Sequence, residues 1–250
     1  MTVGSSPELQ AATDSVDILF QDEDLVVVCK PAGRLVHPSE LEREAGLSEL
    51  ELLTALTGEK LYPAHRLDRP TSGVLVFART PEVAAALGQQ FAQGLVRKRY
   101  LAIVRGHPSI GGIIRHALTR HDDTRSRRRL EGEPQPALTL YHRLGTAVVD
   151  CQVDARYPTS RYALLACYPK TGRRHQIRRH LKHLSHPIIG DSSYGKGPHN
   201  HMFEERFGVR RLYLHAASLQ LSHPGHGQPL QVEAPLPADF WRVVQSLGLR

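Results

Sequence analysis

The sequence has little cysteine, a single tryptophan and no long apolar run. A membrane-spanning helix needs about 20 predominantly apolar residues, so we expect no membrane partner. The first residues, MTVGSSPELQAATD, lack the basic and apolar segments of a secretory signal. This predicts a flexible polar tail over residues 1–16. The three cysteines are far apart and lie beside apolar residues, so we expect buried free thiols in a reducing, cytoplasmic setting.

Several motifs for nucleotide and metal binding are also absent. The chain has no P-loop, no GxGxxG after a strand, no GxSxG and no CxxC pair. Phosphate-cradling enzymes, dinucleotide oxidoreductases and zinc ribbons therefore have little support. Four of the fifteen histidines cluster between His175 and His186, but Arg and Lys surround them and no acid lies near in sequence. A dication would be repelled there, so we expect neither a metal ion nor a cofactor.

Acidic residues are scarce over most of the chain. Residues 1–60 hold twelve acids and four Lys or Arg, a net charge of −8, whereas residues 61–250 hold thirteen acids and twenty-eight Lys or Arg, a net of +15. No acid occurs between Glu82 and Asp122, or between Asp154 and Asp191. A basic surface of this extent favours a polyanionic partner such as nucleic acid.

Apolar periodicity and turn residues predict an α+β chain. Strands are expected within residues 18–30 (two, around an acidic turn), 74–79, 97–106, 138–145, 147–154, 162–168, 211–223 and 228–235. Helices are expected at residues 40–57, 81–94, 173–184 and 237–248, the last with Trp241 in the core. The basic segment 119–136 is expected to be a mobile loop. We predict one domain over residues 17–250, with a mixed, mainly antiparallel central sheet flanked by helices and loops.

The segment AHRLDRPTSG, residues 64–73, places Asp68 between Arg66 and Arg69. The cations favour the ionised carboxylate, and Pro-Thr-Ser-Gly predicts a tight turn that fixes its backbone. Inside an RNA-binding cleft, such a carboxylate can act as a nucleophile or base at a ribose carbon. A solvated salt bridge is the simpler interpretation of this pattern taken by itself.

Four segments in order carry a resemblance to one family. AHRLDRPTSGVLVFA, RKRYLAIVRG, PKTGRRHQIRRHLKHLSHPIIGDSSYG and RLYLHAASLQLSHP resemble the motifs of the RluA-type pseudouridine synthases, and the opening ILFQDEDLVVVCKPAGRLVHPS is similar to that family's start. The resemblance runs from about residue 17 to the C-terminus. Within the family it is most similar to the TruC branch, which modifies a tRNA uridine. It implies a pseudouridine synthase catalytic domain with an RNA-binding cleft across the sheet.

The resemblance also implies roles for individual residues. Asp68 would be the catalytic carboxylate, Tyr100 would lie against the base and help to remove its proton, and Arg178 would pair with Asp68. Arg66 would help to evict the uridine from its helix, as an enzyme acting on a buried base requires. The residues expected to bind RNA or substrate are Arg66, Arg69, Arg173, His175, Ile177, Arg179 and Lys182.

Three alternatives stay open from the residues. The same isomerisation could act on ribosomal RNA, the fold could serve as a non-catalytic RNA-binding module, or Asp68 could be the nucleophile of an unrelated hydrolase. The expected partner is RNA, with tRNA preferred over ribosomal RNA. We expect the protein to be a monomer.

Overall fold

The computed structural model describes residue 13 and residues 15–38, 46–119 and 133–249. These residues form ten strands and five helices, and the strand pairs given below are antiparallel. This confirms the predicted α+β class with a mainly antiparallel sheet. Most of the predicted tail, the first part of the predicted helix 40–57 and most of the segment 119–136 lie outside the described residues. No helix in the described part is long and apolar enough to cross a membrane.

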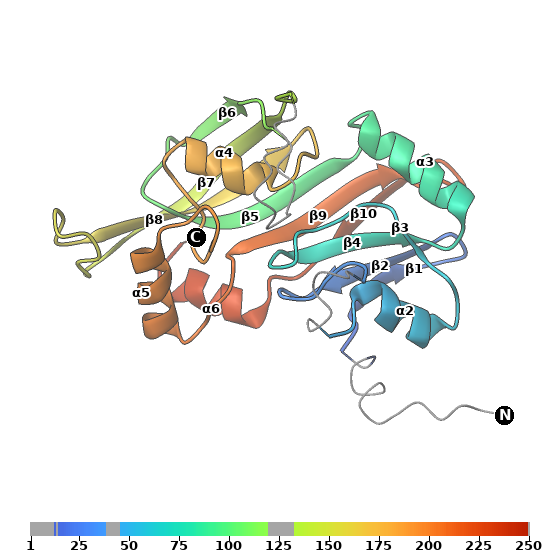
Figure 1. Ribbon diagram of the computed structural model, residues 1–250, viewed down its shortest axis with the longest axis horizontal. Coiled ribbons are helices and arrows are strands. Elements are labelled where there is room, and N and C mark those ends of the chain that lie inside the picture. Colours follow the sequence, from blue (N-terminus) through green and yellow to red (C-terminus); the bar gives the residue numbers. More distant parts are fainter. Residues whose placement is uncertain (1–12, 14, 39–45, 120–132, 250) are drawn as a thin grey trace. The chain divides into compact units, whose positions relative to one another are not determined.

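The chain divides into two compact units, and each is described by itself. The first comprises Met1–Val96 and Ala216–Leu236, and the second comprises Arg97–His215 and Pro237–Arg250. The elements of the first unit (Figure 1) are β1 (Ile18–Gln21), β2 (Leu25–Lys30), α2 (Glu49–Thr57), β3 (Tyr62–Pro63), β4 (Ser72–Ala78), α3 (Pro81–Ala92), β9 (Leu214–Ser222), within which the boundary falls, and β10 (Pro229–Glu233). Their strand order is β1-β2-β4-β9, with β3 on β4 and β10 on β9.

The centre of the first unit is the antiparallel pair β2 and β4. Leu25 pairs with Ala78, and the register continues to Lys30 opposite Gly73. Both strands read as continuous apolar runs, and the side chains on both of their faces are buried. A run without polar alternation is what a strand covered on both faces requires. One face packs with Leu87 of α3 in a single apolar cluster, so β4, which follows the Asp68 loop, is anchored in the core.

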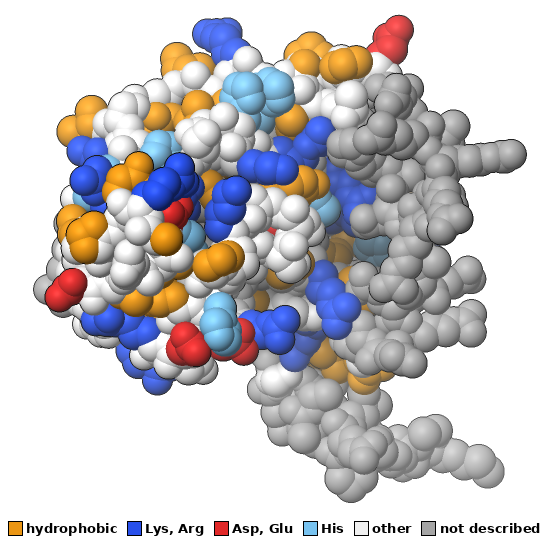
Figure 2. All heavy atoms as spheres, turned by 60° about the vertical axis from the view of Figure 1, so that its left-hand side comes forward, with side chains coloured by type: hydrophobic (Ala, Val, Ile, Leu, Met, Phe, Trp, Pro, Cys, Tyr) orange, Lys and Arg blue, Asp and Glu red, His pale blue; other side chains and the backbone are white. Residues whose placement is uncertain are grey.

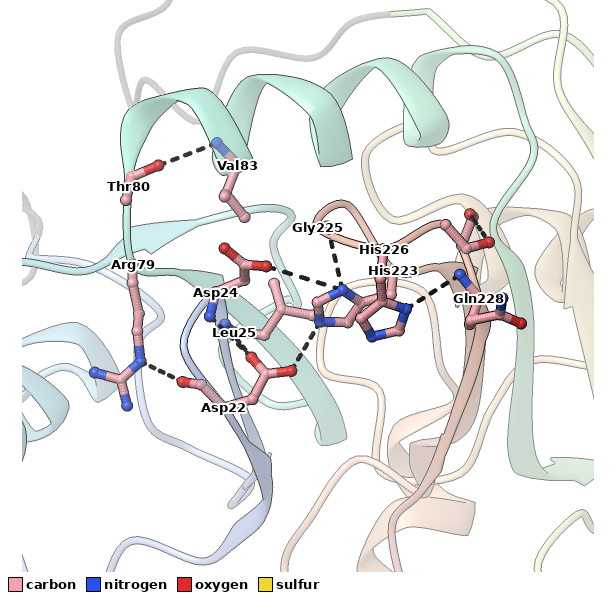
Figure 3. A network of polar contacts seen from close by, with 12 residues as sticks. Asp22, Asp24, Leu25, Arg79, Thr80, Val83, His223, Gly225, His226 and Gln228 are labelled. Atoms are coloured by element: carbon pink, nitrogen blue, oxygen red, sulfur yellow. Dashed lines mark hydrogen bonds and ion pairs between the residues drawn. The ribbon is translucent and has the colours of Figure 1, made fainter.

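A network of polar contacts connects two turns of the first unit (Figure 3). His223, directly after β9, places Nε2 2.8 Å from Oδ2 of Asp22 in the β1–β2 turn. The N–H of Gly225 donates to Nδ1 of the same ring at 3.2 Å. Because Nδ1 accepts, Nε2 carries the proton and donates to the carboxylate. The ring also stacks on His226, with centroids 3.9 Å apart.

The second unit is built on the strand order β5-β8-β7-β6. Its elements are β5 (Arg97–Arg105), β6 (Gly111–Arg115), β7 (Leu138–Val149), β8 (Ser160–Pro169), α4 (Gln176–His183), α5 (Gly197–Phe207) and α6 (Ala238–Ser246). Edge-on aromatic contacts join these elements. Tyr162 of β8 meets Phe203 of α5 at 4.8 Å, Phe203 meets Tyr213 at 5.6 Å, and Tyr213 meets Phe240 of α6 at 5.3 Å. Each such pair contributes about 0.5–1.5 kcal/mol beyond the area that it buries.

Three expectations about the elements are corrected. The two strands expected at 138–145 and 147–154 are one strand, β7, whose register shifts between Arg143 and Gly145. The α2 helix begins only at Glu49, where Ser48 forms a capping box with Glu51. Trp241 is not a core residue, because 42% of it is exposed. Its neighbour Phe240 is buried instead, since α6 turns that side toward Tyr213. The sequence analysis did not predict the strands β3 and β6 or the helix α5.

Candidate active site

Asp68 lies half-buried in the loop between β3 and β4. The N–H of Thr71 donates to the carbonyl of Asp68 at 2.9 Å and closes the predicted tight turn. Arg69 connects this turn to the K-P-A-G loop after β2. Its Nε donates to the carbonyl of Gly33 at 2.9 Å, and its own carbonyl accepts from the N–H of Gly33 at 2.8 Å. The backbone around Asp68 is therefore fixed by two loops that bond to each other.

Lys30 forms hydrogen bonds with the backbone of the same two loops. Its side chain is completely buried at the end of β2. The Nζ atom donates to the carbonyl oxygens of Pro31 at 2.8 Å, Arg34 at 2.9 Å and Arg69 at 3.2 Å. An ammonium has three N–H donors and no acceptor, so three carbonyls match its capacity. One buried side chain thus connects the K-P-A-G loop with the turn that carries Asp68.

The charges near Lys30 balance one another only in part. Burial lowers the pKa of Lys30 to about 7, and the carboxylates of Glu49 and Asp68 oppose this shift. Burial raises the pKa of Glu49, although Arg34 places Nη1 3.1 Å from its Oε2. A cation that loses its hydration needs such nearby acceptors and anions. The Asp68 carboxylate therefore belongs to a group of charges that the first unit itself supplies.

Arg66 and Arg69 differ in whether their guanidinium groups already bond to the protein backbone. Both are exposed, but the Nε of Arg69 is engaged by Gly33. Arg66 follows His65, whose Nε2 accepts from the N–H of Val76 at 3.2 Å and whose ring lies 4.8 Å from that of Phe91. The backbone before Arg66 is therefore anchored to β4 and α3, while its guanidinium lies at the surface.

In the second unit, Tyr100 lies half-buried on β5. It pairs with Cys167 of β8, which pairs with Tyr141 of β7. Residues opposite one another share a face of a sheet. Thr139, two positions before Tyr141 on that face, is hydrogen-bonded to His180 of α4 at 2.9 Å. Tyr100 therefore lies on the face of this sheet against which α4 packs.

Gln176 organises the turn that leads into α4. Its Oε1 accepts from the Thr171 hydroxyl at 2.6 Å and from the N–H of Arg173 at 3.0 Å. Its Nε2 donates to the carbonyl of Leu138 at 3.0 Å and to the hydroxyl oxygen of Thr139 at 2.9 Å. A buried amide with both ends satisfied specifies one conformation. The T-G-R-R-H-Q motif is thus a structural turn bonded to β7.

His175 stands at the start of α4 in the left-handed conformation, with φ 52° and ψ 26°. Its Nδ1 is 3.0 Å from the hydroxyl of Tyr194. Such a conformation is uncommon for a residue with a side chain and requires support from its surroundings. Arg173 is exposed beside it and donates from Nε to the carbonyl of Pro136 at 3.2 Å.

Arg178 makes a buried, bidentate ion pair with Asp191. Its Nε lies 2.8 Å from Oδ2 and its Nη2 2.8 Å from Oδ1 of Asp191. Burial alone would raise the pKa of Asp191, but Arg178 and the N–H groups of Tyr194 and Ser193 outweigh it and hold the pKa below the ordinary value. Such pairing fixes the plane of the guanidinium. Arg178 also lies over the ring of Tyr194, 5.1 Å from its centroid.

The remaining predicted residues of α4 divide between core and surface. Ile177 is buried. Arg179 is half-buried and donates from Nη1 to the carbonyl of Thr119 at 2.8 Å. Lys182 is exposed, with its Nζ 5.6 Å from the centroid of Tyr194. The helix therefore buries its apolar residues, as the sequence predicts, but it also buries one of its cations, Arg178.

The predicted residues thus fall into two groups. Arg66, Asp68 and Arg69 lie in one loop of the first unit, and the other seven lie on β5, α4 and the turn before α4 in the second. The sequence reasoning gave no role to Asp191 or Lys30. The sequence did contain a signal that Asp191 pairs with a cation of the basic helix. Asp191 is the first acid after an acid-free stretch that contains this helix. A lysine directly after the apolar run LVVVC was the corresponding signal for Lys30.

Comparison with known proteins agrees with this arrangement of motifs. A family model described as RNA pseudouridylate synthase matches residues 24–183. The chain is 45% identical over 238 residues to tRNA pseudouridine synthase C of Salmonella typhi, covering 94% of this chain and 91% of that protein. A protein of the same name from Pectobacterium carotovorum subsp. carotovorum is 45% identical over 235 residues, and this chain spans 62% of its length.

A solved structure is similar over nearly the whole chain. Human RNA Pseudouridylate Synthase Domain Containing 4 is 27% identical, with a TM-score of 0.73, covering 97% of this chain and 98% of that one. The family model covers more than half of the chain, and the Salmonella relative matches 94% of it. This chain belongs to the RNA pseudouridylate synthase family.

Proposed function

We propose that the protein converts a specific uridine of tRNA to pseudouridine. The observation that carries the proposal is the 45% identity to tRNA pseudouridine synthase C of Salmonella typhi across 91% of that protein. The charge agrees, because residues 61–250 carry a net charge of +15. Figure 2 shows Lys and Arg side chains spread over one face, with acidic side chains at only a few points of it. Such a surface suits a phosphate backbone.

In the proposed reaction, Asp68 is the catalytic carboxylate. Asp68 has two possible roles as the bond from the ribose carbon to the uracil nitrogen breaks. It attacks that ribose carbon and forms an ester bond that breaks again when the base rejoins, or it removes a ribose proton that is returned to the ribose when the base rejoins. The base turns and forms a bond from a ring carbon to the same ribose carbon, and that ring carbon then loses its proton. A proton is returned to the nitrogen, so no atom is gained or lost. Two hydrogen bonds support this role because they hold the backbone around Asp68 in place. The N–H of Thr71 donates to the carbonyl of Asp68, and Nζ of Lys30 donates to the carbonyl of Arg69.

Tyr100 and Arg178 complete the proposed machinery. Tyr100 contacts the base and assists removal of its proton, and its position on the α4 side of the sheet supports this role. Arg178 orients the Asp68 carboxylate, and its bidentate pair with Asp191 holds its guanidinium ready for that task. The pairing of Arg178 with Asp68 itself stays a prediction.

We assign RNA binding mainly to the exposed and half-exposed cations. Arg66 enters the helix in place of the extruded uridine, and Ile177 packs near the base. The phosphate contacts are assigned to Arg69, Arg173, His175, Arg179 and Lys182. Their affinity is expected to fall steeply with salt, because each cation bound to a phosphate releases a counterion.

The test is release of tritium from unmodified tRNA transcripts. The label sits on the uracil carbon that becomes bonded to the ribose, and no metal or nucleotide is added. Wild type should release tritium into water, and Asp68→Asn should release none while still binding the RNA. Release by Asp68→Asn at the wild-type rate would refute the catalytic role of Asp68.

The same assay separates the alternatives. Release from ribosomal RNA but not from tRNA would favour the other RNA substrate. Salt-sensitive RNA binding without release from either RNA would favour the non-catalytic module. The monomeric state and the cytoplasmic location remain predictions, which sedimentation of the purified protein and fractionation of cells would check.

A further inference from the structure

The sheet of the second unit has an open face opposite Tyr100. Ile113 of β6 pairs with Leu140 of β7, and Leu140 pairs with Tyr168 of β8. These three side chains therefore form a row across the strands on one face. Since successive residues alternate between faces, this face is the reverse of the one that carries Tyr100 and its partner Cys167. The row is exposed at its two ends, with 57% of Ile113 and 37% of Tyr168 accessible.

Cations surround this row on the same face. Arg115 follows Ile113 by two residues on β6, and Lys170 follows Tyr168 by two residues, where its N–H still bonds to Leu138 of β7 at 2.9 Å. Arg97 and Arg99 lie on the same face of β5, because both alternate with Tyr100. The strands β5, β6, β7 and β8 contain no Asp or Glu. We call this group of Arg97, Arg99, Ile113, Arg115, Tyr168 and Lys170 the reverse-face patch.

The packing of the second unit leaves most of the patch exposed among the described residues, and only Arg99 of its cations is half-buried. The α4 helix lies on the opposite face, as the bond between Thr139 and His180 shows. On the face of the patch, α5 covers the other end of β8, where Tyr162 meets Phe203. Arg97, Arg115 and Lys170 are exposed, and no carboxylate of the described residues pairs with them. A sheet surface that combines these three exposed cations with the half-exposed ring of Tyr168 is not part of the apolar core.

The patch is also continuous with the basic turn that leads to α4. Pro169 and Lys170 pass directly into the segment that carries Arg173, which is exposed at the same end of the sheet. Lys170 and Arg173 are three residues apart in the chain and both are exposed. An RNA bound at Arg173 is therefore close to Lys170, which lies at the edge of the reverse face.

We propose that the reverse-face patch is a second docking surface for the RNA substrate, which reaches around this end of the sheet from the α4 side. The inference rests on the proposed function for the identity of the RNA. Guanidinium and ammonium groups bind phosphates, and Tyr168 offers a ring on which a base or ribose packs. The surface contributes affinity and not chemistry, because it lies on the face opposite Tyr100.

A charge-matched pair of variants tests this. The first carries Arg97→Gln, Arg115→Gln and Lys170→Gln. The control carries Arg206→Gln, Arg210→Gln and Arg242→Gln, which removes three exposed cations from the helical side of the same unit. Binding of unmodified tRNA transcripts is measured between roughly 50 and 200 mM salt. The patch variant should bind on the order of tenfold more weakly, with a salt slope smaller by about 1 for each cation removed. The control should match wild type.

Photo-crosslinking gives a second readout in which all the cations of the patch are kept. A benzophenone amino acid replaces Ile113 in one protein and Trp241, which is similarly exposed, in another. The label at Ile113 should crosslink to tRNA, and the label at Trp241 should not. Equal salt slopes for the two triple variants, or no crosslink from Ile113, would overturn the proposal. Both readouts measure binding, so a protein that binds through the patch but releases no tritium would refute the proposed function and leave this inference standing.

Discussion

The guanidinium of Arg178 donates two hydrogen bonds of 2.8 Å to the carboxylate of Asp191, and only 4% and 0% of the two side chains are exposed. Asp191 accepts in addition from the N–H groups of Ser193 and Tyr194, each at 2.9 Å. The pair therefore joins the basic helix α4 to the loop that follows it. It also fixes the side chain proposed to orient Asp68.

Replacing Asp191 by alanine should destabilise the protein strongly. The substitution leaves the Arg178 charge buried without its partner, which costs about 3–5 kcal/mol in other proteins. The free energy of unfolding, measured in urea, should fall by that order. Asp154→Ala, which removes the partly exposed partner of the exposed Arg156, is the control and should have no comparable effect. Equal unfolding midpoints for wild type and Asp191→Ala would contradict this account.

Lys30→Met should reduce tritium release without removing any group that touches the RNA. The change leaves the carbonyls of Pro31, Arg34 and Arg69 without their donor. The Asp68 turn then loses one of its supports, so kcat should fall by roughly tenfold or more. Lys196→Met, at an exposed position, is the matched control. A variant with unchanged kcat would show that Lys30 does not position Asp68.

Gly73→Ala and Gly88→Ala should have opposite effects. Gly73 follows the Asp68 turn with φ 115°, and a Cβ there would overlap the carbonyl of Ala216. The backbone strain alone should cost about 1–3 kcal/mol. Gly88 lies in α3, where a Cβ meets nothing within 4 Å. Alanine there should stabilise the helix by roughly 0.5–1 kcal/mol. Thermal unfolding of both variants measures the difference, and a stabilised Gly73→Ala would contradict the close approach.

The stability contributed by Asp22 should disappear in acid. Burial tends to raise the pKa of Asp22, but the N–H groups of Asp24 and Leu25 and the His223 ring lower it overall. Because the folded pKa lies below the unfolded one, the stabilisation is complete above the unfolded value and is lost as pH falls through the folded value. Unfolding of wild type and Asp22→Asn, measured from neutral pH to about pH 2, should show a difference that shrinks with acidity. A constant difference would exclude this linkage.

Local patterns predicted most of the elements. The apolar run VLVFA is buried in β4 because such a run has no solvated face. Pro81 predicted the start of α3, where the structure has Thr80 as the N-cap. Ile177 and Leu181, four residues apart, predicted the buried side of α4. By contrast, β6 and α5 were missed. The strand GGIIR and the helix GPHNHMFEERF have weak local preferences and form through their packing against neighbouring elements.

The sequence by itself determined the family, the basic surface and the identity of the motifs, because these depend on residue type and order. Only the tertiary structure decided the partners of the charged groups. Asp191 was one of several acids that could have met Arg178, and Lys30 could have pointed to solvent. Which atoms meet depends on strand register and on contacts between residues far apart in the chain, such as Lys30 with Arg69. The reverse-face patch has the same origin, since only the register of four strands places its residues on one face.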